Sequence, residues 1–168
     1  ITTATWLKET GKLVDKLIAL DESSAAARLF KAQLLITEER FNEASWFLDH
    51  AEELLETSEL AEQQAEELWA YYLYLTTLIK SEAEYSGQVS SQVELIYKRQ
   101  KGSWRVAWLL LYLSPEYNRS ASVKWQFLER QFAEGCNSFI IYIEALHLIN
   151  ANPTLLRKLD EFELQIIY

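Results

Sequence analysis

Apolar residues recur at three- and four-residue intervals along nearly the whole chain, which is the periodicity of amphipathic α-helices. A first helix is predicted over residues 3–20, with one apolar stripe formed by Trp6, Leu13, Leu17 and Leu20. Polar residues at 21–24 supply capping chemistry for a second helix, and a break at 37–40 separates that helix from a third. The pattern therefore predicts helices joined by short loops from the start of the chain.

The remaining helices are placed by capping and stop signals. We expect a fourth helix over about 59–84, with Gly87 at or just beyond its end, and a fifth within 88–100, opened by a capping box of Ser91 and Glu94. Four more are predicted over 103–113, 119–133, 138–150 and from Pro153 towards the C-terminus. The run 139–143 is β-branched and aromatic like a buried strand, but its helical spacing continues and no comparable run exists to pair with it.

Turn-forming residues are scarce, with four Gly, two Pro and no Asn-Gly or Asp-Gly pair in 168 residues. Sheet proteins need many tight turns built from those residues, so their shortage favours long helices. We therefore predict an all-α fold of about nine helices, a right-handed stack of antiparallel hairpins of the α-solenoid type. No linker rich in Pro, Gly or Ser interrupts the chain, so we expect one α-helical repeat domain over residues 1–168, with its softest seam near 86–87.

Two stretches resemble known families. The segment AAARLFKAQLLITEERFNEASWFLDHAEELLE, within 25–58, resembles a tetratricopeptide repeat. The resemblance makes Ala32 and Leu35 the small and large residues of the first helix and Phe41 the aromatic turn residue. It also gives the second helix a small–large–small pattern at Ala44, Leu48 and Ala51. The segment lacks the first-helix Trp and the closing Pro of that repeat, and no clear second copy follows.

The second resemblance lies in the C-terminal half. Residues 103–117, SWRVAWLLLYLSPEY, and 131–166 are similar to a stretch of large uncharacterised helical proteins from anaerobic Firmicutes. That resemblance implies that the chain is a segment of a longer polypeptide with a domain of unknown function, and it carries no catalytic residue with it.

The formal net charge is −9, and it is unevenly spread. Residues 41–79 hold nine acidic side chains and no Lys or Arg; the acidic residues are Glu43, Asp49, Glu52, Glu53, Glu56, Glu59, Glu62, Glu66 and Glu67. Such a field repels phosphate groups, so we expect neither nucleic acid nor an anionic membrane as a partner. The longest apolar run, 106–113, is too short for a membrane span. The simplest interpretation of the acidic run is a solvated helix face.

Few residues are suited to catalysis or metal binding. The chain has two histidines and one cysteine, too few for a Cys/His zinc site, and the single Glu144-x-x-His147 lacks the second copy that a di-iron bundle needs. His147 lies about 16 Å along its helix from Cys136, too far to act as its base. No phosphate-binding glycine loop is present, so we expect no cofactor. The lone cysteine does not discriminate between cellular compartments.

The best binding candidates cluster around Gly102. Arg99, Lys101 and Arg105, together with Lys98, place four cations within eight residues, with Trp104 among them and Tyr117 one helix later. Arg, Trp and Tyr dominate binding hot spots, so these side chains suit a protein or peptide partner, or a flanking domain of the same polypeptide. The alternative is that the cations only favour the negative ends of helix dipoles.

Three hypotheses for function follow. The first is a non-enzymatic scaffold or protein–protein interaction segment. The second is a helical enzyme or cofactor-binding domain with a cleft lined by carboxylates and by the aromatic residues Trp69, Tyr71, Tyr72, Tyr74 and Trp108. The third is a structural element that assembles through exposed aromatic faces.

Overall fold

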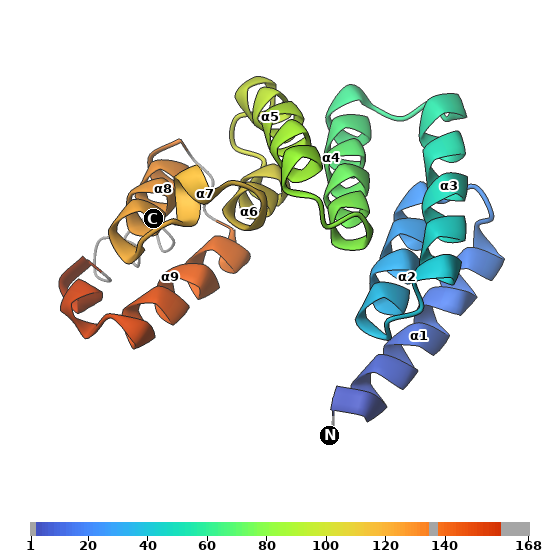
Figure 1. The fold of residues 1–168 in the computed structure, drawn as a ribbon, viewed down its shortest axis with the longest axis horizontal. Coiled ribbons are helices and arrows are strands. Elements are labelled where there is room, and N and C mark those ends of the chain that lie inside the picture. Colours follow the sequence, from blue (N-terminus) through green and yellow to red (C-terminus); the bar gives the residue numbers. More distant parts are fainter. Residues whose placement is uncertain (1–2, 135–137, 159–168) are drawn as a thin grey trace. The chain divides into compact units, whose positions relative to one another are not determined.

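A computed structural model of the chain describes residues 3–134 and 138–158. Within these residues all regular structure is helical, with nine α-helices, one 3-10 helix and no strand, which confirms the all-α prediction (Figure 1). The elements are α1 (Thr3–Leu20), α2 (Ala25–Thr37), α3 (Phe41–Thr57), α4 (Glu62–Ile79), α5 (Ala83–Arg99), α6 (Trp104–Leu113), α7 (Pro115–Asn118), α8 (Ala121–Ala133), α9 (Phe139–Ala151) and the 3-10 helix η1 (Pro153–Lys158).

The chain forms two compact units, Ile1–Ser86 (unit 1) and Gly87–Tyr168 (unit 2). The single repeat domain and the right-handed solenoid both remain predictions.

Unit 1 is built around the hairpin of α2 and α3, with α1 packed on α2 and α4 packed against both hairpin helices. Its core contains Leu29, Ala32, Leu48, Ala51 and Leu75, all buried. The small residues Ala32 and Ala51 let the helices approach closely, and the leucines fill the space between them. Tyrosines and other apolar residues of the second half of α4 pack against this core, as expected of a helix that is apolar all round.

The hairpin begins and turns where the sequence indicates. Ser24 caps α2, and its hydroxyl accepts a hydrogen bond from the backbone N–H of Ala27 at 3.2 Å. In the loop that follows α2, Glu39 adopts a positive φ of 59°, and Arg40 forms ion pairs with Glu38 and Glu43 at 2.9 and 2.6 Å. The buried positions of the tetratricopeptide-like pattern are buried in the structure, but its aromatic turn residue, Phe41, is exposed.

The predicted boundary between the fourth and fifth helices is wrong. The chain breaks earlier, at residues 80–82, and α5 then runs from Ala83 through Gly87 to Arg99. Gly87 therefore lies inside α5, and Ser91 does not cap a helix, because its hydroxyl donates to the Gly87 carbonyl at 3.1 Å within the helix. Tyr85 stabilises this earlier break. Its hydroxyl lies 2.8 Å from that of Thr76, and its ring centroid lies 4.5 Å from the Lys80 ammonium group.

In unit 2, α9 packs against α6, α8 and η1, and α7 joins α6 to α8. Ser103 and Ser120 cap α6 and α8, and each hydroxyl accepts a hydrogen bond from the backbone N–H of the third residue that follows. Pro115 occupies the first turn of α7. Phe139 begins α9, which confirms a helix over 139–143. Pro153 begins a 3-10 helix rather than the predicted α-helix, and the rest of that predicted helix lies outside the described residues.

Candidate functional site

The turn that connects α5 to α6 carries most of the predicted binding residues. Arg99 ends α5, and Gly102 turns the chain with a φ of +86°, a conformation that favours glycine. Ser103 then caps α6 and Trp104 begins it. This local geometry holds the four cations and the indole within one short segment, which we call the basic turn (residues 98–105).

Within the basic turn, one cation stacks on the aromatic ring. The Arg105 guanidinium carbon lies 4.6 Å from the centroid of the half-buried Trp104 ring, a cation–π arrangement worth about 0.5–1 kcal/mol at exposed sites. Arg99 and Lys101 are exposed on the same turn, and Lys98 lies 3.9 Å from Glu94. The segment thus combines a fixed aromatic surface with several solvent-facing cations.

Tyr117, the fifth predicted residue, is held by a different set of contacts. Its hydroxyl donates to Glu94 on α5 at 2.7 Å, and its ring centroid lies 4.7 Å from that of Phe127 on α8. Burial, together with the hydrogen bond to Glu94 and its negative charge, raises the pKa of Tyr117. The residue therefore ties α7 to α5 and α8, and its hydroxyl is already engaged.

A buried carboxylate that the binding hypothesis did not use lies among α6, α8 and α9. Glu144, only 8% exposed, accepts hydrogen bonds from Tyr112 at 3.0 Å and Trp108 at 3.4 Å and pairs with Lys124 at 3.1 Å. Burial alone would raise the pKa of Glu144, but Lys124 and the two aromatic donors outweigh burial and lower it. Both carboxylate oxygens have partners, so the cluster binds three helices together.

A second buried polar cluster connects α5 to α8. The fully buried amide of Gln131 donates to the Tyr97 hydroxyl at 2.8 Å, and that hydroxyl lies 3.1 Å from a carboxylate oxygen of Glu134. Burial raises the pKa of Tyr97 to about 12. Sequence reasoning missed both clusters, because the bonded partners lie 20 to 37 residues apart in the chain and no spacing rule joins them.

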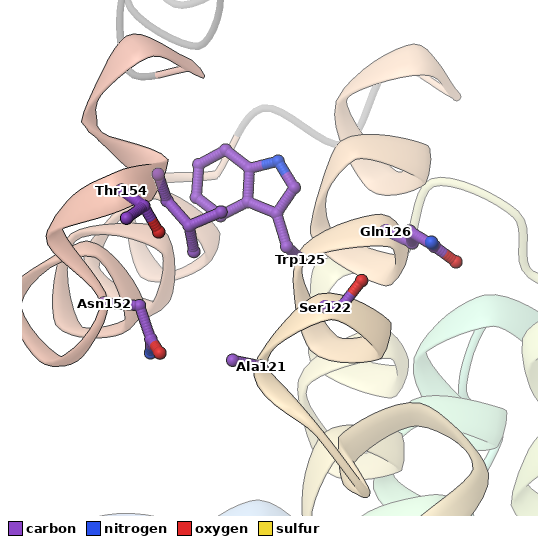
Figure 2. Close-up of a pocket in the computed structure, with 7 residues that line it drawn as sticks. Ala121, Ser122, Trp125, Gln126, Asn152 and Thr154 are labelled. Atoms are coloured by element: carbon purple, nitrogen blue, oxygen red, sulfur yellow. The ribbon is translucent and has the colours of Figure 1, made fainter.

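A small pocket of about 260 Å³ lies between α8 and η1. Figure 2 shows the Trp125 indole extending from α8 towards Thr154 on η1. The pocket is lined by Ala121, Ser122, Trp125, Gln126, Asn152, Thr154 and Leu155. None of these side chains is ionisable at neutral pH, so they supply no general acid, base or charged metal ligand.

The other candidate reactive residues are dispersed. Cys136 lies outside the described residues, and His147 is exposed on α9. His50 stacks edge-on against Trp46 with ring centroids 4.5 Å apart, and its Nδ1 is buried with no hydrogen-bond partner in the described part of the chain. Across residues 3–134 and 138–158, no three His, Cys, Asp or Glu residues are grouped in a way that could hold a metal ion.

The aromatic residues of the cleft hypothesis fall in two different units. Tyr71, Tyr72 and Tyr74 pack against the core of unit 1, and the Trp69 ring stacks on Tyr72 with centroids 5.0 Å apart. Tyr71 and Tyr72 are hydrogen-bonded through their hydroxyls to Gln33 and Glu52. Trp108 belongs to unit 2 and bonds to Glu144.

Among the described helices, none is both long enough and apolar enough to cross a bilayer. Comparison with curated proteins finds no match, and comparison with solved structures finds none. Residues 1–168 match the Family of unknown function (DUF5717), N-terminal, over their whole length. The chain therefore belongs to this family.

Proposed function

We propose that this chain is a non-enzymatic helical interaction segment of a larger protein, which binds its partner through the basic turn. The partner is an acidic stretch of another protein or of a flanking domain of the same polypeptide. One observation carries the proposal, namely that Arg105 is stacked on Trp104 while Arg99 and Lys101 stand exposed beside it. Aromatic and Arg side chains held in place in this way lose little conformational freedom on binding.

The charge distribution supports an acidic partner for this turn. Unit 1 contains 7 basic and 17 acidic side chains, a net charge of −10, whereas unit 2 contains 9 and 8, a net charge of +1. The basic turn is thus a concentration of positive charge in a nearly neutral unit, and it attracts acidic segments without needing a basic protein overall.

The competing explanation gives the cations a purely local role. Lys98 and Arg99 lie in the last turn of α5, where positive charge interacts favourably with the helix dipole. That role accounts for two of the four cations. It does not account for Arg105 on Trp104 in the first turn of α6, where the dipole disfavours positive charge.

Binding to a fluorescently labelled oligoglutamate peptide tests the proposal. We expect Arg99→Ala/Trp104→Ala/Arg105→Ala to weaken binding at least about tenfold, since hot-spot residues each contribute over about 1 kcal/mol. Arg119→Ala/Arg130→Ala removes two exposed cations of unit 2 outside the turn and serves as the control. If the triple variant binds the peptide as tightly as the wild-type chain does, the basic turn is not the binding site.

A further inference from the structure

The apolar stripe predicted for the first helix lies on the surface of unit 1. Its four large side chains have exposed fractions of 54% to 84%; they are Trp6, Leu13, Leu17 and Leu20. α1 packs on α2 through a different face, which carries the buried Val14 and the half-buried Leu7 and Ile18. At about 100° per residue, the centre of the stripe lies about 120° around the helix from that face. Large apolar side chains gathered on one exposed face are uncommon on monomeric proteins and mark interaction surfaces.

The stripe follows the seven-residue repeat of a coiled-coil seam. Trp6, Leu13 and Leu20 follow one another at intervals of seven residues. Thr10 and Leu17 lie between them, each four residues after one and three residues before the next. Alternating steps of four and three residues keep a narrow seam facing a single partner helix. The spacing therefore favours one helix, rather than a broad surface, as the occupant of this face.

Two opposite charges border the stripe on the edge away from α2. Glu9 directly precedes Thr10 and Lys16 directly precedes Leu17, which are positions that flank a coiled-coil seam. Both side chains are exposed. Glu9 pairs with Lys12 of its own helix at 3.1 Å, whereas Lys16 forms no ion pair within the described part of the chain. On a helix that runs in the opposite direction, the same two charges occur in reverse order.

We propose that two copies of this chain associate through their α1 helices, packed antiparallel about a twofold axis. The axis passes the middle of α1, between residues 11 and 12. Trp6 of each copy then packs against Leu17 of the other, and Thr10 packs against Leu13. The same register brings Glu9 of each copy beside Lys16 of the other, so both flanking charges are paired on each copy.

These flanking charges select a second copy, and the antiparallel direction, as the occupant. In a parallel pair the position opposite Glu9 is Val14, which is buried against α2 and uncharged. The antiparallel pair matches both charges and also opposes the two helix dipoles. A helix of another protein would need the same repeat with the charges in reverse order. α1 already supplies both when it is turned around.

The contact is small and closed. Each α1 helix is about 27 Å long at 1.5 Å per residue, and one helix pair lies at the small end of specific interfaces, so association depends on protein concentration. Both copies use the same surface, so assembly stops at the dimer. α1 belongs to unit 1, and the contact is therefore independent of the basic turn.

Sedimentation velocity of the 168-residue chain, from about 5 to about 500 µM, tests the proposal in the range where small interfaces associate. We expect the wild-type chain to form dimers and no larger species. Leu17→Gln leaves every charge in place and should weaken dimerisation at least about tenfold, because the twofold axis places the lost leucine in the contact twice. Leu95→Gln is the control. It removes from α5 a leucine of matching exposure, 55% against 54%, and should dimerise as the wild type does.

Exchanging the charges at positions 9 and 16 tests the register. Glu9→Lys alone and Lys16→Glu alone each place like charges side by side twice, and each should weaken dimerisation about fivefold. Glu9→Lys/Lys16→Glu restores opposite charges and should recover the dimerisation of the wild type, as should an equimolar mixture of the two single variants. Lys8→Glu makes a similar change on the opposite face of α1 and should have little effect.

Circular dichroism of each variant checks that the helices remain folded. A wild-type chain that is monomeric throughout, species that grow beyond the dimer, or unchanged dimerisation of Leu17→Gln would overturn the proposal. Failure of Glu9→Lys/Lys16→Glu to recover dimerisation would overturn it too, because the charges would then not select an antiparallel second copy. The variants of the basic turn leave this experiment unaffected, so failure here is separate from failure of the proposed function.

Discussion

Glu144 is a carboxylate whose surroundings keep it charged inside unit 2. Its pKa is lowered because Lys124 and the donors Tyr112 and Trp108 outweigh the cost of burial. A carboxyl group with a lowered folded-state pKa stabilises the fold at pH values above its unfolded pKa of about 4.3. That contribution is lost as the pH falls through the lower, folded-state value.

We therefore expect Glu144→Gln to reduce the free energy of unfolding by about 1–3 kcal/mol at pH 7, because it leaves Lys124 without its anionic partner. The difference from wild type should shrink as the pH falls through the lowered folded-state pKa of Glu144, because the wild-type carboxylate then becomes protonated too. Urea titrations at a series of pH values measure both effects. Glu116→Gln alters an exposed carboxylate of α7 and should show neither effect, and a pH-independent difference for Glu144→Gln would contradict the assigned charge.

At the residue scale, the sequence shows which kinds of side chain are present better than it predicts which side chains contact one another. Trp104 and Arg105 are adjacent in the chain, so their neighbourhood was predictable, although the stacking of one on the other was not. Glu144 was noticed only for its spacing to His147, whereas its partners come from two other helices. The sequence held one signal for this buried cluster, namely a lone carboxylate in the strongly apolar stretch 139–151, because a buried charge needs a partner.

α5 shows how a helix boundary depends on more than its local signals. Gly87 resembles a helix stop, and Ser91 with Glu94 resembles a start, yet the helix runs through all three residues. Tyr85 contacts Lys80 and Thr76, and these contacts stabilise the break at residues 80–82. No capping rule includes these side chains. Where capping residues agree with the tertiary contacts, as at Ser24 and Ser103, the helix starts were predictable.

The continuity of α5 predicts opposite effects for alanine at two glycines. Gly87 lies in the exposed interior of α5 with no atom within 4 Å of an added Cβ, so Gly87→Ala should raise the free energy of unfolding by about 0.5–1 kcal/mol. Gly102 has a φ of +86°, so Gly102→Ala should lower it by about 1–2 kcal/mol. Urea unfolding of the two variants compares them directly. Destabilisation by Gly87→Ala would instead indicate that a helix ends there.

α1 shows that hydrophobic periodicity predicts a helix without telling what covers it. The spacing correctly placed a helix over residues 3–20, and the stripe of Trp6, Leu13, Leu17 and Leu20 is real. The core of unit 1, however, is filled by α2, α3 and α4, and α1 contacts that assembly mainly through α2. Sequence alone cannot distinguish an apolar face turned to the core from one left for a partner.

At the scale of the whole molecule, charge is divided unequally between the units. The net charge of −10 in unit 1 makes its folded state repel itself, and the repulsion is strongest where acidic residues follow one another on a helix. Glu53 and Glu56 stand three residues apart near the C-terminal end of α3, where the helix dipole also disfavours negative charge. Salt screens both effects, because the Debye length falls from about 30 Å at 0.01 M to about 10 Å at 0.1 M.

We therefore expect the melting temperature of the dilute chain to rise as salt increases from about 0.01 to about 0.2 M. Glu53→Gln/Glu56→Gln should raise the melting temperature at low salt by about 1–3 °C and reduce its salt dependence. Low protein concentration keeps the chains apart, so that salt acts on the folding of single chains. Thermal unfolding followed by circular dichroism at 222 nm, the standard helix signal, gives the readout. Favourable ion pairs also lie elsewhere in the same unit, among them Lys31 with Asp15 and Arg40 with Glu43, and salt weakens them. A melting temperature that falls with salt would therefore mean that these pairs outweigh the repulsion, and that the acidic surface is a tolerated feature rather than a destabilising one.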